Sequence, residues 1–224
     1  MEGVKADLKS IAENFSLTFK EKWFSYATLP PRKLVICLFL LGCPLPEYQK
    51  LGSGRSIEQR FENLQTFVES TFFQERTRKY KHHERSGGTI VHKSCLAYRK
   101  HLPRIEDARL REEVESIFEK VAQHMSGEVI AVLCETMNEK MSKHVLKHEW
   151  GHVLLEKNDI SFQKQGKSWR WDEGLVTYMT QYPSPPWGRR GDAHSQYAQK
   201  WKKLLENCET PTERLAKIKE QLRA

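Results

Sequence analysis

The sequence predicts an α+β fold, in which a small α/β N-terminal part with a mixed sheet is followed by a helical part. Short apolar or β-branched segments, typical of strands, occur at residues 89–91, 95–98 and 128–133. Apolar side chains at helical spacing dominate the rest of the chain, and the 38% hydrophobic and 29% charged residues are those of a globular protein. We expect an N-terminal part over residues 1–126 and a C-terminal part over residues 127–224, or one compact domain that includes both.

A helix over residues 5–26 is the first element that we expect, because apolar side chains recur at helical spacing from Leu8 to Phe19. Pro30 and the proline after it end this helix. The apolar run LVICLFLL follows at residues 34–41. It is far shorter than the roughly 20 residues of a membrane-spanning helix, so it predicts a buried core element and no transmembrane segment.

Ser56 begins the next predicted helix, because serine caps helix N-termini by accepting backbone hydrogen bonds. The inner face of this helix consists of Phe61, Leu64, Phe67 and Val68. Residues 75–85, ERTRKYKHHER, are the densest basic run in a chain whose formal net charge is +8. The run is short and contains acidic residues, so we interpret it as a solvated basic segment and predict no nucleic-acid-binding module.

Two short strands, at residues 89–91 and 95–98, precede a helix from residue 105 to about residue 124. The apolar side chains of that helix fall on one face: Leu110, Val114, Ile117, Phe118 and Val121. Residues 128–133, EVIAVL, give the best strand prediction in the chain, because they are apolar and partly β-branched.

The C-terminal part is predicted to be helical. We expect helices over residues 138–156, 171–182 and 192–207, and a short amphipathic tail from Thr212. The proline-rich segment at residues 183–186 ends the second of these helices.

The chain has five cysteines, an odd number, and no C-x-x-C pair occurs. This argues against a disulfide framework and against a cysteine-based zinc knuckle. The N-terminus is charged and amphipathic rather than apolar, so no signal peptide is predicted. A reducing compartment fits these features best, and we expect a cytoplasmic protein.

Residues 148–152 read His-Glu-Trp-Gly-His, an HExxH motif on a predicted helix. Two histidines four residues apart project from the same helix face, one turn apart. Both imidazoles can then reach one metal ion at roughly 2.0–2.1 Å. Glu149 points to the side of that face, where it can contact a water on the metal without binding the metal itself.

A catalytic zinc site needs three protein ligands and one open position for water. Glu173 is the best candidate for the third ligand, because it lies 21 residues after His152 on another predicted helix. That separation leaves room for a loop and for the second helix to pack against the first. The sequence therefore predicts one zinc ion per chain, bound by His148, His152 and Glu173.

The HEWGH motif followed by the segment WDEGLVTY resembles the gluzincin zinc metallopeptidases, the superfamily of thermolysin-like enzymes and M1-like aminopeptidases. Their pattern is HExxH, then roughly 20 residues, then a glutamate that is often part of W-x-x-E-G-x-x-x-Y. Gly174 and Tyr178 match this pattern, whereas Trp171 lies two residues before the glutamate instead of three. The resemblance covers about residues 128–183.

This resemblance implies a hydrolase that cleaves a peptide or protein substrate, with zinc bound by the two histidines and Glu173. It implies that Glu149 acts as the general base. It also implies that the strand at residues 128–133 lines the cleft and pairs with an extended substrate.

Several positions around the motif depart from the family pattern. Thermolysin-like members carry an aspartate one turn after the glutamate ligand, where it hydrogen-bonds a zinc histidine; Thr177 holds this position here and is a weaker partner. Tyr178 is a second candidate, which we expect mainly to pack, and Asp172 points elsewhere on the helix. His194 and Tyr197 are candidates for the donor that stabilises the transition state. The G-x-M-E-N motif of M1 aminopeptidases does not occur, so an aminopeptidase assignment has no support.

Two alternatives stay open. The chain loosely resembles the ImmA/IrrE-like group of regulatory zinc proteins, which act on one specific partner, and it lacks a recognisable helix-turn-helix. A non-catalytic zinc scaffold is the other alternative, and the intact Glu149 argues against it. A general peptidase should cleave unrelated peptides, a regulatory one should cleave a single partner, and a scaffold should bind zinc and cleave nothing.

Overall fold

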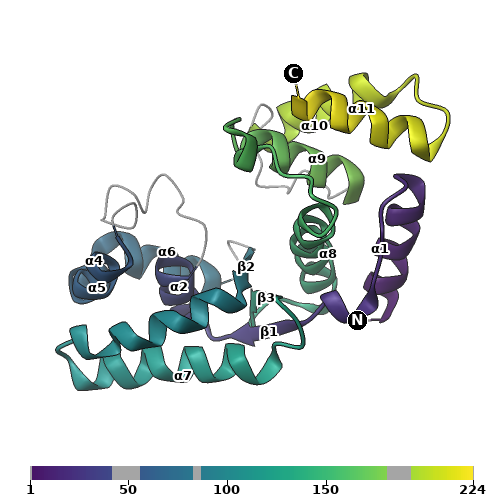
Figure 1. The fold of residues 1–224 in the computed structure, drawn as a ribbon. Helices are drawn as coiled ribbons and strands as arrows, with labels where there is room; N and C mark the ends of the chain where they lie inside the picture. Colours follow the sequence, from purple (N-terminus) through teal and green to yellow (C-terminus); the bar gives the residue numbers. More distant parts are fainter. Residues whose placement is uncertain (1, 42–55, 83–86, 181–192, 224) are drawn as a thin grey trace. The chain divides into compact units, whose positions relative to one another are not determined.

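The computed structural model describes residues 2–41, 56–82, 87–180 and 193–223, apart from the side chains of residues 193–195. It confirms an α+β fold with a three-stranded mixed sheet and many helices. The chain forms two compact units (Figure 1). We call Lys22–Val145 the sheet unit, and Met1–Glu21 together with Leu146–Ala224 the helical unit.

The sheet contains β1 (Tyr26–Leu29), β2 (Gly88–His92) and β3 (Val129–Cys134). Strand β3 lies in the centre, parallel to β1 and antiparallel to β2. All six residues of β3 are buried, as expected for an apolar strand with a neighbour on each side. The strand predicted at residues 128–133 is thus confirmed, with a shift of one residue.

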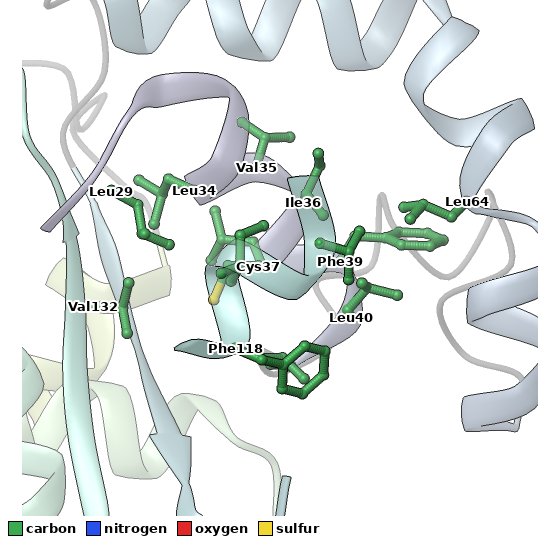
Figure 2. Close-up of a cluster of buried hydrophobic side chains, with 14 of the residues drawn as sticks. Leu29, Leu34, Val35, Ile36, Cys37, Phe39, Leu40, Leu64, Phe118 and Val132 are labelled. Carbon is green, nitrogen blue, oxygen red and sulfur yellow. The ribbon is translucent and has the colours of Figure 1, made fainter. Parts of the chain in front are cut away.

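The core of the sheet unit lies between the sheet and its helices. These are α2 (Pro31–Leu40), α4 (Ile57–Glu62), α5 (Leu64–Glu69), α6 (Thr71–Lys81) and α7 (Ala108–His124). Helices α2 and α7 pack against β1, β3 and each other (Figure 1). Figure 2 shows Leu29 and Val132 from the strands facing Leu34 and Cys37 of α2. Every residue from Leu34 to Leu40 is buried, so the predicted core element is confirmed.

Local sequence signals explain where several helices begin. Pro31 occupies the first position of α2, where its missing N–H costs nothing. Ser56 caps α4, as the sequence predicts, and the structure adds that Gln59 completes a capping box. Asp107 caps α7 by accepting a hydrogen bond from the N–H of Leu110 at 2.7 Å.

Two local predictions are wrong. The first helix, α1 (Glu2–Asn14), ends well before residue 26, because Ser16 adopts a left-handed φ of 53° and the chain then enters β1. Residues 95–98 lie in a 3-10 helix, η2 (Lys93–Arg104), instead of a strand. Strand β2 ends at His92 because its partner, Val129, is the first residue of β3. The backbone N–H of Lys93 still donates to the carbonyl oxygen of Glu128 at 2.7 Å, and η2 begins at this residue.

The helical unit contains α1, the second half of α8 (Glu139–Glu156), α9 (Arg170–Thr180), α10 (Ala193–Leu205) and α11 (Pro211–Arg223). The division therefore falls inside α8, whereas the sequence suggested residue 126. Strand β3 belongs to the sheet unit because its hydrogen-bonding partners are there. The N-terminal segment joins the helical unit, where the Phe15 ring contacts the Tyr178 ring edge-on at 6.2 Å between centroids.

The helices predicted over residues 138–156, 171–182 and 192–207 correspond to α8, α9 and α10. The proline-rich segment at residues 183–186, which was predicted to end α9, lies outside the described residues. Within the part of the chain that the structure describes, no helix has the length and apolar character needed to cross a membrane.

Candidate metal centre

Helix α8 presents the two motif histidines on one face. The imidazole rings of His148 and His152 lie 4.9 Å apart between centroids, at an angle of 81°. Their Nε2 atoms are 3.2 Å apart. The four-residue spacing therefore brings both ring nitrogens to one point beside the helix.

Glu173 reaches the same point from the first turn of α9. Its Oε2 atom lies 3.2 Å from Nε2 of His148, and its Oε1 atom lies 3.4 Å from Nε2 of His152. The exposed fractions of the side chains are 13% for His148, 17% for His152 and 25% for Glu173. The three side chains are thus mostly buried, and each keeps some exposure to solvent.

The separations between these ligand atoms fit a tetrahedral metal ion. Two ligands bound at roughly 2.0–2.1 Å with a tetrahedral angle between them lie about 3.3 Å apart. The two histidine nitrogens are 3.2 Å apart, and each lies close to this value from one of the two Glu173 oxygens, His148 at 3.2 Å from Oε2 and His152 at 3.4 Å from Oε1. Among the described residues, His148, His152 and Glu173 form a group of potential metal ligands whose atoms all lie within 4.8 Å of one another. Two imidazoles and one carboxylate are also a ligand set that suits zinc.

His152 and Glu173 form an ion pair, with Nε2 of the histidine 3.4 Å from Oε1 of the glutamate. Burial alone would raise the pKa of Glu173, but the charges and hydrogen bonds of His152 and His148 hold that pKa well below its ordinary value. Burial likewise works to lower the pKa of His152, and the carboxylate of Glu173 outweighs it, with help from Glu149 and Asp172. The pKa of His152 is thereby raised to about 9.

Glu149 directly follows His148 on α8 and is half-buried. Burial raises the pKa of its carboxyl group. The nearby histidines work against this rise, and the negative charge of Glu173 adds to it. A carboxylate whose pKa lies above its ordinary value is a better proton acceptor near neutral pH.

The two ligand-bearing helices can approach closely because Gly151 has no side chain. A Cβ atom at this position would lie 2.8 Å from Cγ1 of Val176 and 3.0 Å from Cγ2 of Thr180, whereas carbon atoms in contact are normally about 3.5–4.0 Å apart. This role of Gly151 was not predicted from the sequence, although a glycine in the middle of a helix is a signal for close packing.

Gly174 has the same role between α9 and α10. A Cβ atom there would meet the backbone of Tyr197, at 2.7 Å from its carbonyl carbon and 3.0 Å from its Cα atom. Next to this contact, the Trp171 ring packs edge-on against the rings of Tyr197 and Trp201, at 5.1 and 5.4 Å between centroids. The indole N–H of Trp201 also donates to the carbonyl oxygen of Trp171 at 3.0 Å. These contacts fix the start of α9, where Glu173 lies.

The remaining candidate residues have other surroundings. The Tyr197 ring packs against Trp171, and the ammonium group of Lys200 lies 4.1 Å from its centroid. The side chain of His194 lies outside the described residues. Thr177 is buried, and its hydroxyl group has no hydrogen-bond partner within the described part of the chain. The Tyr178 ring packs edge-on against the Phe15 ring.

Comparison with known proteins found no matching family model, no matching curated protein and no matching solved structure. The resemblance to gluzincins therefore rests on the motif residues alone.

Proposed function

We propose that this chain is a zinc-dependent metallopeptidase in which His148, His152 and Glu173 bind one zinc ion. The observation that supports this most is the spacing of the ligand atoms. The two histidine nitrogens are 3.2 Å apart, and each has one oxygen of Glu173 within 3.2–3.4 Å, close to the spacing around a tetrahedral ion, although the side chains come from two helices. Three protein ligands leave one tetrahedral position open, which is the arrangement of a catalytic site and not of a structural one.

In this proposal the zinc ion, when bound, supplies a Lewis acid that polarises the scissile carbonyl group and makes water acidic enough to react near neutral pH. Glu149 has the role of general base. Its carboxylate accepts a proton from the attacking water and later delivers it to the leaving amine. The burial that raises its pKa suits both steps, because the group must release the proton as well as accept it.

Metal analysis and cleavage assays test the proposal. The full chain, purified without added metal and then supplied with zinc at neutral pH, should hold about one zinc ion. The variants His148→Ala and Glu173→Ala should hold none, and Glu149→Gln should keep the metal but lose cleavage. A wild-type chain that binds no zinc would refute the proposal.

The substrate range separates this proposal from its alternatives. Cleavage of unrelated peptides supports a general peptidase, whereas cleavage of a single native protein would indicate a regulatory enzyme of the ImmA/IrrE-like kind. Zinc binding without any cleavage would indicate a scaffold.

The setting that we propose for this activity is the cytoplasm. Cys37, Cys95, Cys134 and Cys208, the cysteines in the described part of the chain, are all free. Free thiols persist in reducing compartments.

A further inference from the structure

Asp172 lies one residue before Glu173, and both of its carboxylate oxygens bind the loop that joins α8 to α9. Oδ1 accepts a hydrogen bond from the backbone N–H of Phe162, and Oδ2 accepts one from the N–H of Gln163, each at 2.9 Å. Hydrogen bonds to an ionised carboxylate are shorter and stronger than neutral ones. Because each oxygen has its own donor, the orientation of the whole carboxylate is fixed.

The same point of the loop is also held through its side chain. Phe162 is completely buried. Its ring stacks on Trp171, at 6.1 Å between centroids and an angle of 27°, and meets the Trp201 ring at 5.4 Å. The two residues before Glu173 therefore both hold Phe162: the Trp171 ring packs against the Phe162 ring, and the Asp172 carboxylate accepts the backbone N–H of Phe162.

This double attachment matters because Glu173 lies in the first turn of α9. The helix begins at Arg170, and the ends of helices fray unless other contacts hold them. A metal site needs its ligands within about 0.5 Å of the productive position. The loop is the direct covalent connection between the helix with the two histidines and the helix with the glutamate, so its conformation limits where α9 can begin.

We propose that Asp172 is a positioning residue for the metal centre. By accepting the N–H groups of Phe162 and Gln163, it fixes the loop against the first turn of α9 and holds Glu173 at metal-binding distance from both histidines. This inference rests on the proposed zinc site and assigns to Asp172 no contact with metal or substrate.

A matched control separates positioning from general stability. Asp107 makes an ordinary cap on α7, in the sheet unit, through one backbone N–H. The test compares full-length wild type with Asp172→Ala, Asp172→Asn and Asp107→Ala. Zinc affinity is measured by competition with a chromophoric chelator, the ligand geometry by the visible absorption of the cobalt(II) form, and stability by thermal melting of the metal-free proteins.

We expect Asp172→Ala to raise the zinc dissociation constant by about 10- to 100-fold and to change the cobalt spectrum. Asp172→Asn keeps one accepting oxygen, so its effect should be smaller. Asp107→Ala should lower the melting temperature while leaving the zinc dissociation constant within about twofold of wild type.

Several results would overturn the role of Asp172. One is a folded Asp172→Ala chain with wild-type zinc affinity and cobalt spectrum. Should that variant fail to fold, a folded Asp172→Asn chain with both properties unchanged would have the same meaning. An equal loss of affinity in Asp107→Ala would show that only general stability is involved. These results leave the zinc site itself intact, whereas a wild-type chain without zinc would refute both proposals together.

Discussion

Replacing Gly174 by alanine should loosen the metal centre, because the added methyl group has no space. Its Cβ atom would overlap the Cβ atom of Tyr197 and would lie 2.7 Å from the carbonyl carbon and 3.0 Å from the Cα atom of the same residue. The backbone atoms and the Cβ atom attached to them cannot rotate out of the way as the far end of a side chain could. Restoring a normal carbon–carbon contact requires α9 and α10 to separate by about 1 Å.

Two effects on stability oppose each other in this variant. Alanine favours the helical state by about 1 kcal/mol relative to glycine, whereas overpacking costs about 1–3 kcal/mol. A clash with backbone belongs at the upper end of that range, so the free energy of unfolding of the metal-free protein should fall by about 1–2 kcal/mol. Since Glu173 is the adjacent residue, a shift of α9 by about 1 Å exceeds the tolerance of a metal site and should reduce zinc affinity at least about tenfold.

Urea denaturation of the metal-free protein and chelator competition measure these two effects. Gly3→Ala is the matched control, because Gly3 lies in α1 and a Cβ atom there meets nothing within 4 Å. The free energy of unfolding of the Gly3→Ala control should rise by up to about 1 kcal/mol, and its zinc affinity should stay unchanged. An equal rise in the free energy of unfolding of Gly174→Ala and Gly3→Ala would refute the close packing of α9 on α10. Normal zinc affinity in a destabilised Gly174→Ala chain would refute the connection from that packing to Glu173.

Three further predictions concern single side chains. Glu149→Gln should keep one zinc ion and reduce the rate of peptide cleavage by about 10²–10⁴-fold; undiminished cleavage would exclude Glu149 as the base. Thr177→Val should raise the free energy of unfolding of the metal-free protein by about 1 kcal/mol, because a hydroxyl group with no partner among the described residues is buried there; a loss of stability in urea denaturation would mean that the hydroxyl is satisfied. Asn158→Ala should lower the free energy of unfolding of the metal-free protein by about 1–3 kcal/mol. The side-chain amide of Asn158 accepts the backbone N–H of Thr18 at 2.8 Å and donates to the Thr18 carbonyl oxygen at 3.0 Å. Unchanged stability would mean that this contact does not hold the N-terminal segment.

The parts of the fold that depend on local pattern could be predicted from the sequence. The apolar run of α2, the cap at Ser56 and the central strand β3 all follow from composition and spacing. Strand β1 could not be predicted, because its four residues become a strand only by pairing with β3 about 100 residues later in the chain. The end of β2 likewise depends on where its partner begins.

The candidate site divides in the same way. The proximity of the three proposed ligands could be predicted from sequence spacing, since a helical repeat places His148 and His152 on one face and a second helix can bring Glu173 to them. The residues that hold the helices in place were not found. The contacts of Gly151, Gly174 and Asp172 are with residues on other helices or in a loop. No periodic pattern in the sequence shows which residues meet across such a contact.

Removal of the metal should lower the melting temperature more at pH 9 than at pH 6. In the metal-free protein Glu173 raises the pKa of His152 from about 6.5 to about 9, so the stability from this ion pair is fully present below about pH 6.5 and is lost as the pH rises through 9. Zinc binding requires neutral His152, so its affinity changes in the opposite direction and increases over the same pH range. A bound ion stabilises the fold more when its affinity is higher. As the pH rises, the stability of the metal-free chain thus falls, and the additional stability that bound zinc provides increases. Thermal melting of zinc-loaded and chelator-treated protein at both pH values measures the difference, and an equal or larger shift at pH 6 would show that protons and metal do not compete for the same side chains.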